Sequence, residues 1–125
     1  MTDEVISEEV ARFILQYIDS IAQWEGLLLL RADPSVEWSA ESVAQRLYTS
    51  KADAARLLDH WISKGFVYNT GKGYIYQTVS PELDLKVEQV AECYTKFLVP
   101  ITHLIHSKPK TRVQEFADAF WLRKD

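Results

Sequence analysis

The sequence has one cysteine, Cys93, and no long apolar run. A single thiol cannot form an internal disulfide framework, so the chain is not a small disulfide-stapled secreted domain. The longest apolar run is the leucine stretch at 27–30, far shorter than the roughly 20 residues that span a bilayer. The first residues are acidic where a secretion signal is basic. We therefore expect a cytoplasmic protein without a membrane-spanning helix.

Motifs for catalysis and for cofactor binding are also missing. The sequence contains no GxSxG nucleophile motif, no Walker loop and no dinucleotide fingerprint. His103 and His106 share a helix face by spacing, but no nearby cysteine or acid completes a metal site. Cys93 follows Glu92, and an acidic neighbour does not activate a thiol. We predict that the protein is not an enzyme and needs no metal and no cofactor.

Charge is distributed unevenly along a chain that is otherwise typical of one globular domain. The 125 residues are 47% apolar and 26% charged, with a net charge of −4. Residues 1–45 contain nine acidic and two basic residues, whereas residues 46–80 contain five basic and two acidic residues. The middle third is thus the only net basic part, as local contact with nucleic acid requires. Such a small excess also arises readily by chance.

Residues 38–77 have the signals of two short helices followed by a hairpin. Ser39 and Ser50 are good N-caps, each followed by apolar residues at helical spacing. Gly65 stands where the second helix would end in a left-handed residue. Aromatic β-formers then flank the turn-forming residues 69–73. The order helix, tight turn, helix and hairpin predicts a mainly α fold, a winged helix-turn-helix with a small β-hairpin wing and long flanking helices.

The segment before this module is predicted to be helical and to contribute one short strand. Residues 5–24 have an apolar stripe at helical spacing, and Asp19-Ser20 is a signal for a new helix start. Residues 36–38 can form a strand that pairs with the wing. The predicted boundaries within the single domain are an N-terminal helical arm at 1–18, the winged helix-turn-helix at 19–79 and a C-terminal helical arm at 80–125.

The segment after the wing is predicted to form a long helix. Ser80-Pro81-Glu82 is a strong start signal, because it combines a capping serine, a proline in the first turn and an acid. Pro100 lies inside the continuing pattern, so we expect a kink near residues 96–100. The helix should end at residues 107–110. Thr111 and Gln114 have capping-box spacing for a last short amphipathic helix.

The apolar stripes of the two arms are wide for a domain of this size. A homodimer with the same patch on both subunits is the simplest way to cover them. The alternative is that both arms fold back on the winged domain within a monomer. The expected dimer-interface residues are Phe13, Tyr17, Val90, Tyr94, Phe97 and Ile101.

Residues 19–76, the Ser80-Pro81-Glu82-Leu83 start and residues 116–120 together resemble a widespread group of small bacterial winged-helix proteins. The helix-turn-helix and wing are more broadly similar to MarR-type and PadR-type transcriptional regulators. In those families the second helix of the motif enters the DNA major groove, the wing tip touches phosphate and a long helix after the wing builds the dimer. The resemblance implies that the residues contacting double-stranded DNA are Ser50, Lys51, Arg56, His60 and Lys72.

Two functions from different classes remain open. The first is a DNA-binding transcriptional regulator, favoured by the basic middle third and by Lys51 at the start of the second motif helix. The second is a winged-helix protein–protein interaction module that binds a partner regulator without binding DNA. Asp53 and Asp59, on or beside the face that would meet DNA, favour this alternative. His60 could contact the groove or be a partly buried histidine.

Overall fold

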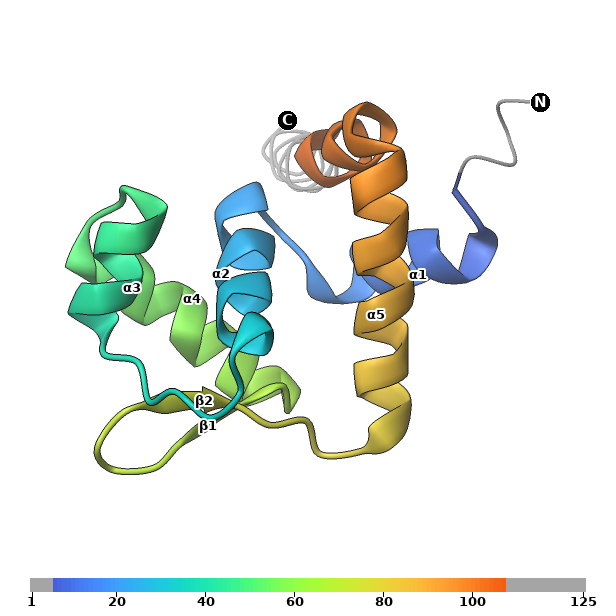
Figure 1. The fold of residues 1–125 in the computed structure, drawn as a ribbon. Coiled ribbons are helices and arrows are strands. Elements are labelled where there is room, and N and C mark those ends of the chain that lie inside the picture. The colour runs from blue at the N-terminus through green and yellow to red at the C-terminus, as the bar shows by residue number, and fades with distance from the viewer. Residues whose placement is uncertain (1–5, 108–125) are drawn as a thin grey trace, which may run out of the picture.

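The computed structural model describes residues 6–107, which form a group of helices with a small antiparallel hairpin at one edge (Figure 1). Residues 98–107 are also helical. The short helix expected from Thr111 and the helix end at 107–110 lie wholly or largely outside the described residues. The elements in chain order are α1 (Glu8–Tyr17), α2 (Ile21–Ala32), α3 (Ala40–Leu47), α4 (Lys51–Lys64), β1 (Val67–Asn69), β2 (Tyr74–Tyr76) and α5 (Pro81–Lys96).

The N-terminal helical region is divided in two by residues 18–20. Ile18 is extended, and the Ser20 hydroxyl starts α2 by accepting from the backbone N–H of Gln23 at 3.1 Å. The Gln23 side chain in turn accepts from the backbone N–H of Asp19 at 2.8 Å. The two bonds satisfy the amide of Gln23 in the first turn of α2 and the amide of Asp19 just before the helix. The predicted restart of the helix at Ser20 is confirmed.

The helix-turn-helix and wing also form as predicted. Ser39 and Ser50 cap α3 and α4, and Gly65 ends α4 in the left-handed conformation with φ 88°. β1 pairs antiparallel with β2, with Val67 opposite Tyr76. Trp38 and Tyr74 exchange backbone hydrogen bonds of 2.9 and 2.8 Å, so the predicted strand at 36–38 is present as a single bridge.

The helix after the wing starts at Ser80, as predicted, and is broken rather than only kinked near Pro100. Phe97 leaves the helical conformation, with φ −131° and ψ 58°, and the chain is helical again from residue 98. Pro100 is then the third residue of a new helical segment, where a missing N–H costs no internal hydrogen bond. Among residues 6–107, no helix is both long and apolar enough to cross a membrane.

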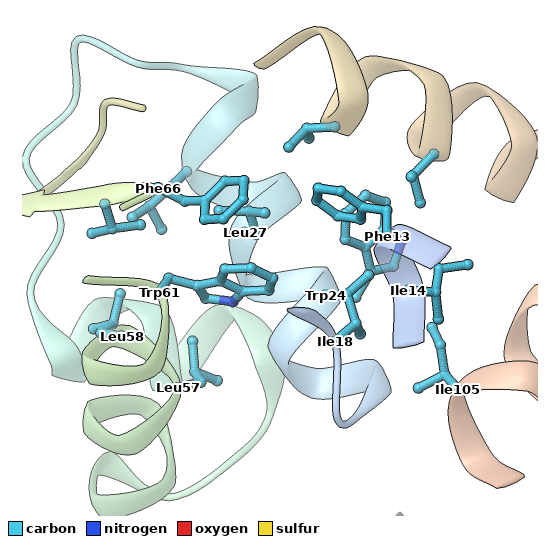
Figure 2. Packing of buried hydrophobic residues seen from close by; sticks show 14 of the residues in the cluster. Phe13, Ile14, Ile18, Trp24, Leu27, Leu57, Leu58, Trp61, Phe66 and Ile105 are labelled. Atoms are coloured by element: carbon cyan, nitrogen blue, oxygen red, sulfur yellow. The ribbon is translucent and has the colours of Figure 1, made fainter. Parts of the chain in front are cut away.

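One hydrophobic core joins the helical arms to the winged module (Figure 2). Trp61 and Phe66 stack edge to face, with ring centroids 5.1 Å apart, and Phe66 also meets Phe13 of α1 at 5.9 Å. The helix at 98–107 contributes Ile101 and Ile105, both fully buried. In Figure 1, α3 lies on one side of α2 and α1 and α5 lie on the other, while α4 extends past α2 and contacts α1 through His60. The exposed first turn of α4 is thus on a different part of the molecule from α5.

Candidate nucleic-acid interface

The start of α4 lies on the surface and is fixed by its own cap. The Ser50 hydroxyl accepts from the backbone N–H of Asp53 at 3.0 Å, and Thr49 donates its backbone N–H to the carbonyl of Ala44 at 3.0 Å. These bonds fix the end of α3 and the start of α4. The exposed Lys51 follows as the first residue of α4. The geometry therefore presents the first turn of α4, with Lys51, to solvent.

The two cations expected to contact DNA on this helix are each paired with a carboxylate. Lys51 Nζ lies 3.3 Å from Glu41 Oε2 of α3, and both side chains are about two-thirds exposed. Arg56 forms an ion pair with Asp53 one turn earlier on α4. The hydrogen bond from Arg56, with a smaller one from Ser50, lowers the pKa of Asp53. Such exposed pairs are weak and screened by salt, so a polyanion can compete for both cations.

His60 lies on the side of α4 that faces α1. Its Nε2 is 2.7 Å from the backbone carbonyl oxygen of Tyr17, which requires the ring nitrogen to donate. Its ring also packs edge to face on Trp61, with centroids 4.9 Å apart. This placement is that of the partly buried histidine considered from the sequence. His60 therefore supports the packing of α1 against α4.

The wing tip is a tight turn organised by Thr70. Its hydroxyl accepts from the backbone N–H groups of Lys72 and Gly73, both at 3.1 Å, and lies 2.8 Å from Glu37 Oε2. Gly71 adopts φ 92°, which a side chain would disfavour. The turn leaves Lys72 exposed at the end of the hairpin. Lys72 is thus on the surface, and the Glu37 carboxylate lies beside the same turn.

The residues expected at a dimer interface divide into two groups. Phe13, Val90 and Ile101 are at most 3% exposed within a single chain. The others, Tyr17, Tyr94 and Phe97, are only partly covered. The Tyr94 hydroxyl donates to Glu25 of α2 at 2.5 Å. The chain's own packing therefore covers much of both stripes, which is the arrangement considered as the alternative to a dimer.

A polar cluster and one tyrosine were missed by sequence reasoning. Arg31, Tyr76 and Asp84 meet beside an open cleft of about 650 Å³ that residues 76–81 also line. These residues lie far apart in the sequence, and no local pattern predicts their meeting. Tyr48 ends α3 in the left-handed conformation with its side chain in solvent. A tyrosine at a helix end gives no signal for that conformation.

Comparisons with known proteins identify the fold. No protein-family description and no curated protein matches the sequence. Among solved structures, the chain is similar to a MarR family transcriptional regulator from Silicibacter pomeroyi, with a TM-score of 0.53 and 12% sequence identity. The match covers 99% of this chain and 88% of that chain. Likeness at this identity is one of fold, and it agrees with the helix order, the hairpin and the long helix after it. The chain therefore has a MarR-like winged-helix fold.

Proposed function

We propose that the protein is a cytoplasmic transcriptional regulator that binds double-stranded DNA with α4 and the wing. The observation that carries the proposal is the exposed first turn of α4, with Lys51 at its start, on a module of MarR-like winged-helix fold. Helix-turn-helix proteins present the first residues of the second helix to base edges in the major groove. Lys51, Arg56 and Lys72 are the proposed phosphate or base contacts, and Ser50 lies at the same helix start.

The carboxylates on this surface define how the proposed contact would work. Glu41 and Asp53 neutralise part of the charge of Lys51 and Arg56 in the free protein. Binding must then exchange each ion pair for a contact with phosphate, so the net electrostatic gain per cation is reduced. We expect moderate affinity for generic duplexes and a steep loss of binding as salt rises, because phosphate contacts release counterions.

The test is fluorescence anisotropy on one generic duplex across a salt series. Lys51→Ala and Arg56→Ala should weaken binding, and each should flatten the log–log salt slope by roughly one unit per subunit. Lys86→Ala is the matched control, since Lys86 is an exposed cation on α5. Binding that is equal in all three variants, or absent in the wild type at low salt, would contradict the proposal and leave the protein-interaction module as the function.

A second variant tests the same contact by gain rather than loss. Glu41→Gln removes the carboxylate 3.3 Å from Lys51 and keeps the shape of the side chain. Exposed ion pairs are worth about 0.2–1 kcal/mol, so duplex binding at low salt should tighten by about threefold. Glu88→Gln, which removes an exposed acid from α5, is the control for the change in net charge. An equal gain in both variants would show only a general effect of net charge.

A further inference from the structure

Tyr48 has a backbone conformation that tyrosine disfavours. It is the only non-glycine residue with positive φ among residues 6–107, with φ 56° and ψ 47°. In this conformation the Cβ atom crowds the following carbonyl oxygen, which is why glycine or asparagine is usual at such a helix end. The capping bond there uses only the backbone N–H of Tyr48, which donates to the carbonyl of Ala44. Any residue other than proline could supply that bond.

Among residues 6–107, the side chain of Tyr48 contributes neither to the core nor to a hydrogen bond. It is 96% exposed, and its hydroxyl has no hydrogen-bond partner within the described part of the chain. Within this part of the chain, neither packing nor hydrogen bonding by the side chain offsets the unfavourable backbone conformation. An unfavourable backbone conformation that no contact of the side chain offsets is a reason to look for a functional role of that side chain.

Tyr48 lies next to the helix that is proposed to bind DNA. It lies in the turn between α3 and α4, three residues before Lys51. The turn is fixed by two backbone N–H groups, those of Tyr48 and Thr49, which both donate to the carbonyl of Ala44. The exposed phenol thus belongs to a hydrogen-bonded turn beside the start of the helix that is proposed to enter the groove.

We propose that the Tyr48 hydroxyl donates a hydrogen bond to a phosphate oxygen of the duplex whose groove receives α4; this rests on the proposed function. Tyrosine hydroxyls are among the groups that bind DNA phosphates and fix the position of a protein on the duplex. A neutral donor suits this surface, because Glu41 and Asp53 already pair with the nearby cations. Tyr48 is a positioning contact that carries no sequence information by itself.

Tyr48→Phe tests the hydroxyl alone, by anisotropy on the duplex and salt series described above. Hydrogen bonds to charged groups justify an expected loss of about tenfold in affinity. Tyrosine is neutral and releases no counterion, so the loss should be the same at every salt concentration and the slope should stay at the wild-type value. Lys51→Ala, in contrast, should flatten the slope. Leu85→Ala, which shortens an exposed side chain of α5, should change neither the affinity nor the salt slope.

Tyr48→Gly separates this contact from a structural role. Glycine adopts positive φ without the Cβ clash, so the midpoint of thermal unfolding should rise by about 2 °C while duplex binding falls. A lower midpoint would assign Tyr48 to the fold and overturn the inference. Wild-type affinity or a flatter slope in Tyr48→Phe would overturn it while leaving the proposed function intact. If the wild type does not bind the duplex at low salt, both the Tyr48 contact and the proposed function are contradicted.

Discussion

Arg31, Tyr76 and Asp84 join three elements through one carboxylate oxygen. The Tyr76 hydroxyl donates to Asp84 Oδ1 at 2.6 Å, and Arg31 Nε donates to the same oxygen at 3.1 Å. The bond from Tyr76 is the main cause that lowers the pKa of Asp84, while burial raises the pKa of Tyr76. The cluster ties the end of α2 and the strand β2 to the first turn of α5.

Asp84 should make the stability of the protein sensitive to acid. A carboxyl whose pKa is lower in the folded state stabilises the fold above its unfolded pKa, and this stability is lost as pH falls through the folded pKa. Asp84→Asn should therefore cost about 0.5–1 kcal/mol at pH 7, because the side chain is 44% exposed, and less at pH 3. Urea unfolding at both pH values measures this difference. Glu88→Gln is the control, and an equal cost for Asp84→Asn at both pH values would contradict the assignment.

At the scale of elements, α2 and α4 approach each other closely at Gly26. A Cβ atom on Gly26 would lie 2.6 Å from Leu57 Cδ1 of α4 and 3.4 Å from Leu47 Cδ1 of α3. Gly26 is buried in the middle of α2, where glycine weakens the helix. The contact between helices therefore explains a glycine that local preference alone would not select.

Gly26→Ala compares the free-energy cost of crowding this contact with the gain in helix propensity. Alanine should gain about 1 kcal/mol in the helix and lose about 1–3 kcal/mol by overpacking, so the net loss should be about 1 kcal/mol. Gly26→Val should lose more, because its branched side chain is larger and a poorer helix former. Thermal unfolding of both variants checks the order. A higher midpoint for Gly26→Ala would mean that the end of the Leu57 side chain moves aside at little cost.

Element boundaries were largely predictable because they depend on local chemistry. The hydroxyls of Ser20, Ser39, Ser50 and Ser80 each accept a backbone N–H at a helix start, and a residue needs no tertiary contact to do so. The break at Phe97 was predicted only as a kink. Pro100 prevents a continuous helix, but which residue leaves the helical conformation depends on packing of the next segment.

Contacts between residues far apart in the sequence were less predictable than element boundaries. An amphipathic stripe shows that a face is buried and does not show what buries it, so the cover over Phe13 and Ile101 could not be inferred from spacing. The candidate DNA contacts were inferred from position along α4. Their ion pairs with Glu41 and Asp53 depend on side-chain geometry that a linear sequence does not specify.

At the scale of the whole molecule, the arms pack on the winged module and still leave apolar surface. Leu98 and Val99 are 51% and 64% exposed at the start of the helical segment 98–107. These residues are next to Phe97, one of the residues expected in a dimer interface. A homodimer contact through this surface remains our prediction, and it requires no opening of the core.

Leu98→Glu tests the predicted dimer without disturbing the buried residues. The wild type should sediment as a dimer at micromolar concentration, and the variant should shift toward monomer because a charge in an apolar interface is costly. Leu85→Glu is the matched control, since Leu85 is 54% exposed on α5. Sedimentation velocity gives the species directly. A wild type that sediments as a monomer would contradict the prediction.

The most direct measurement of where DNA binds is the change in backbone amide NMR signals when a short generic duplex is added at low salt. The proposed function predicts changes concentrated at residues 48–56 and 70–73, which are the turn, the first half of α4 and the wing tip. Amides of α5, on the other side of α2 in Figure 1, should change little. Changes confined to α5, or no changes at all, would contradict the assignment of α4 and the wing as a DNA-binding surface.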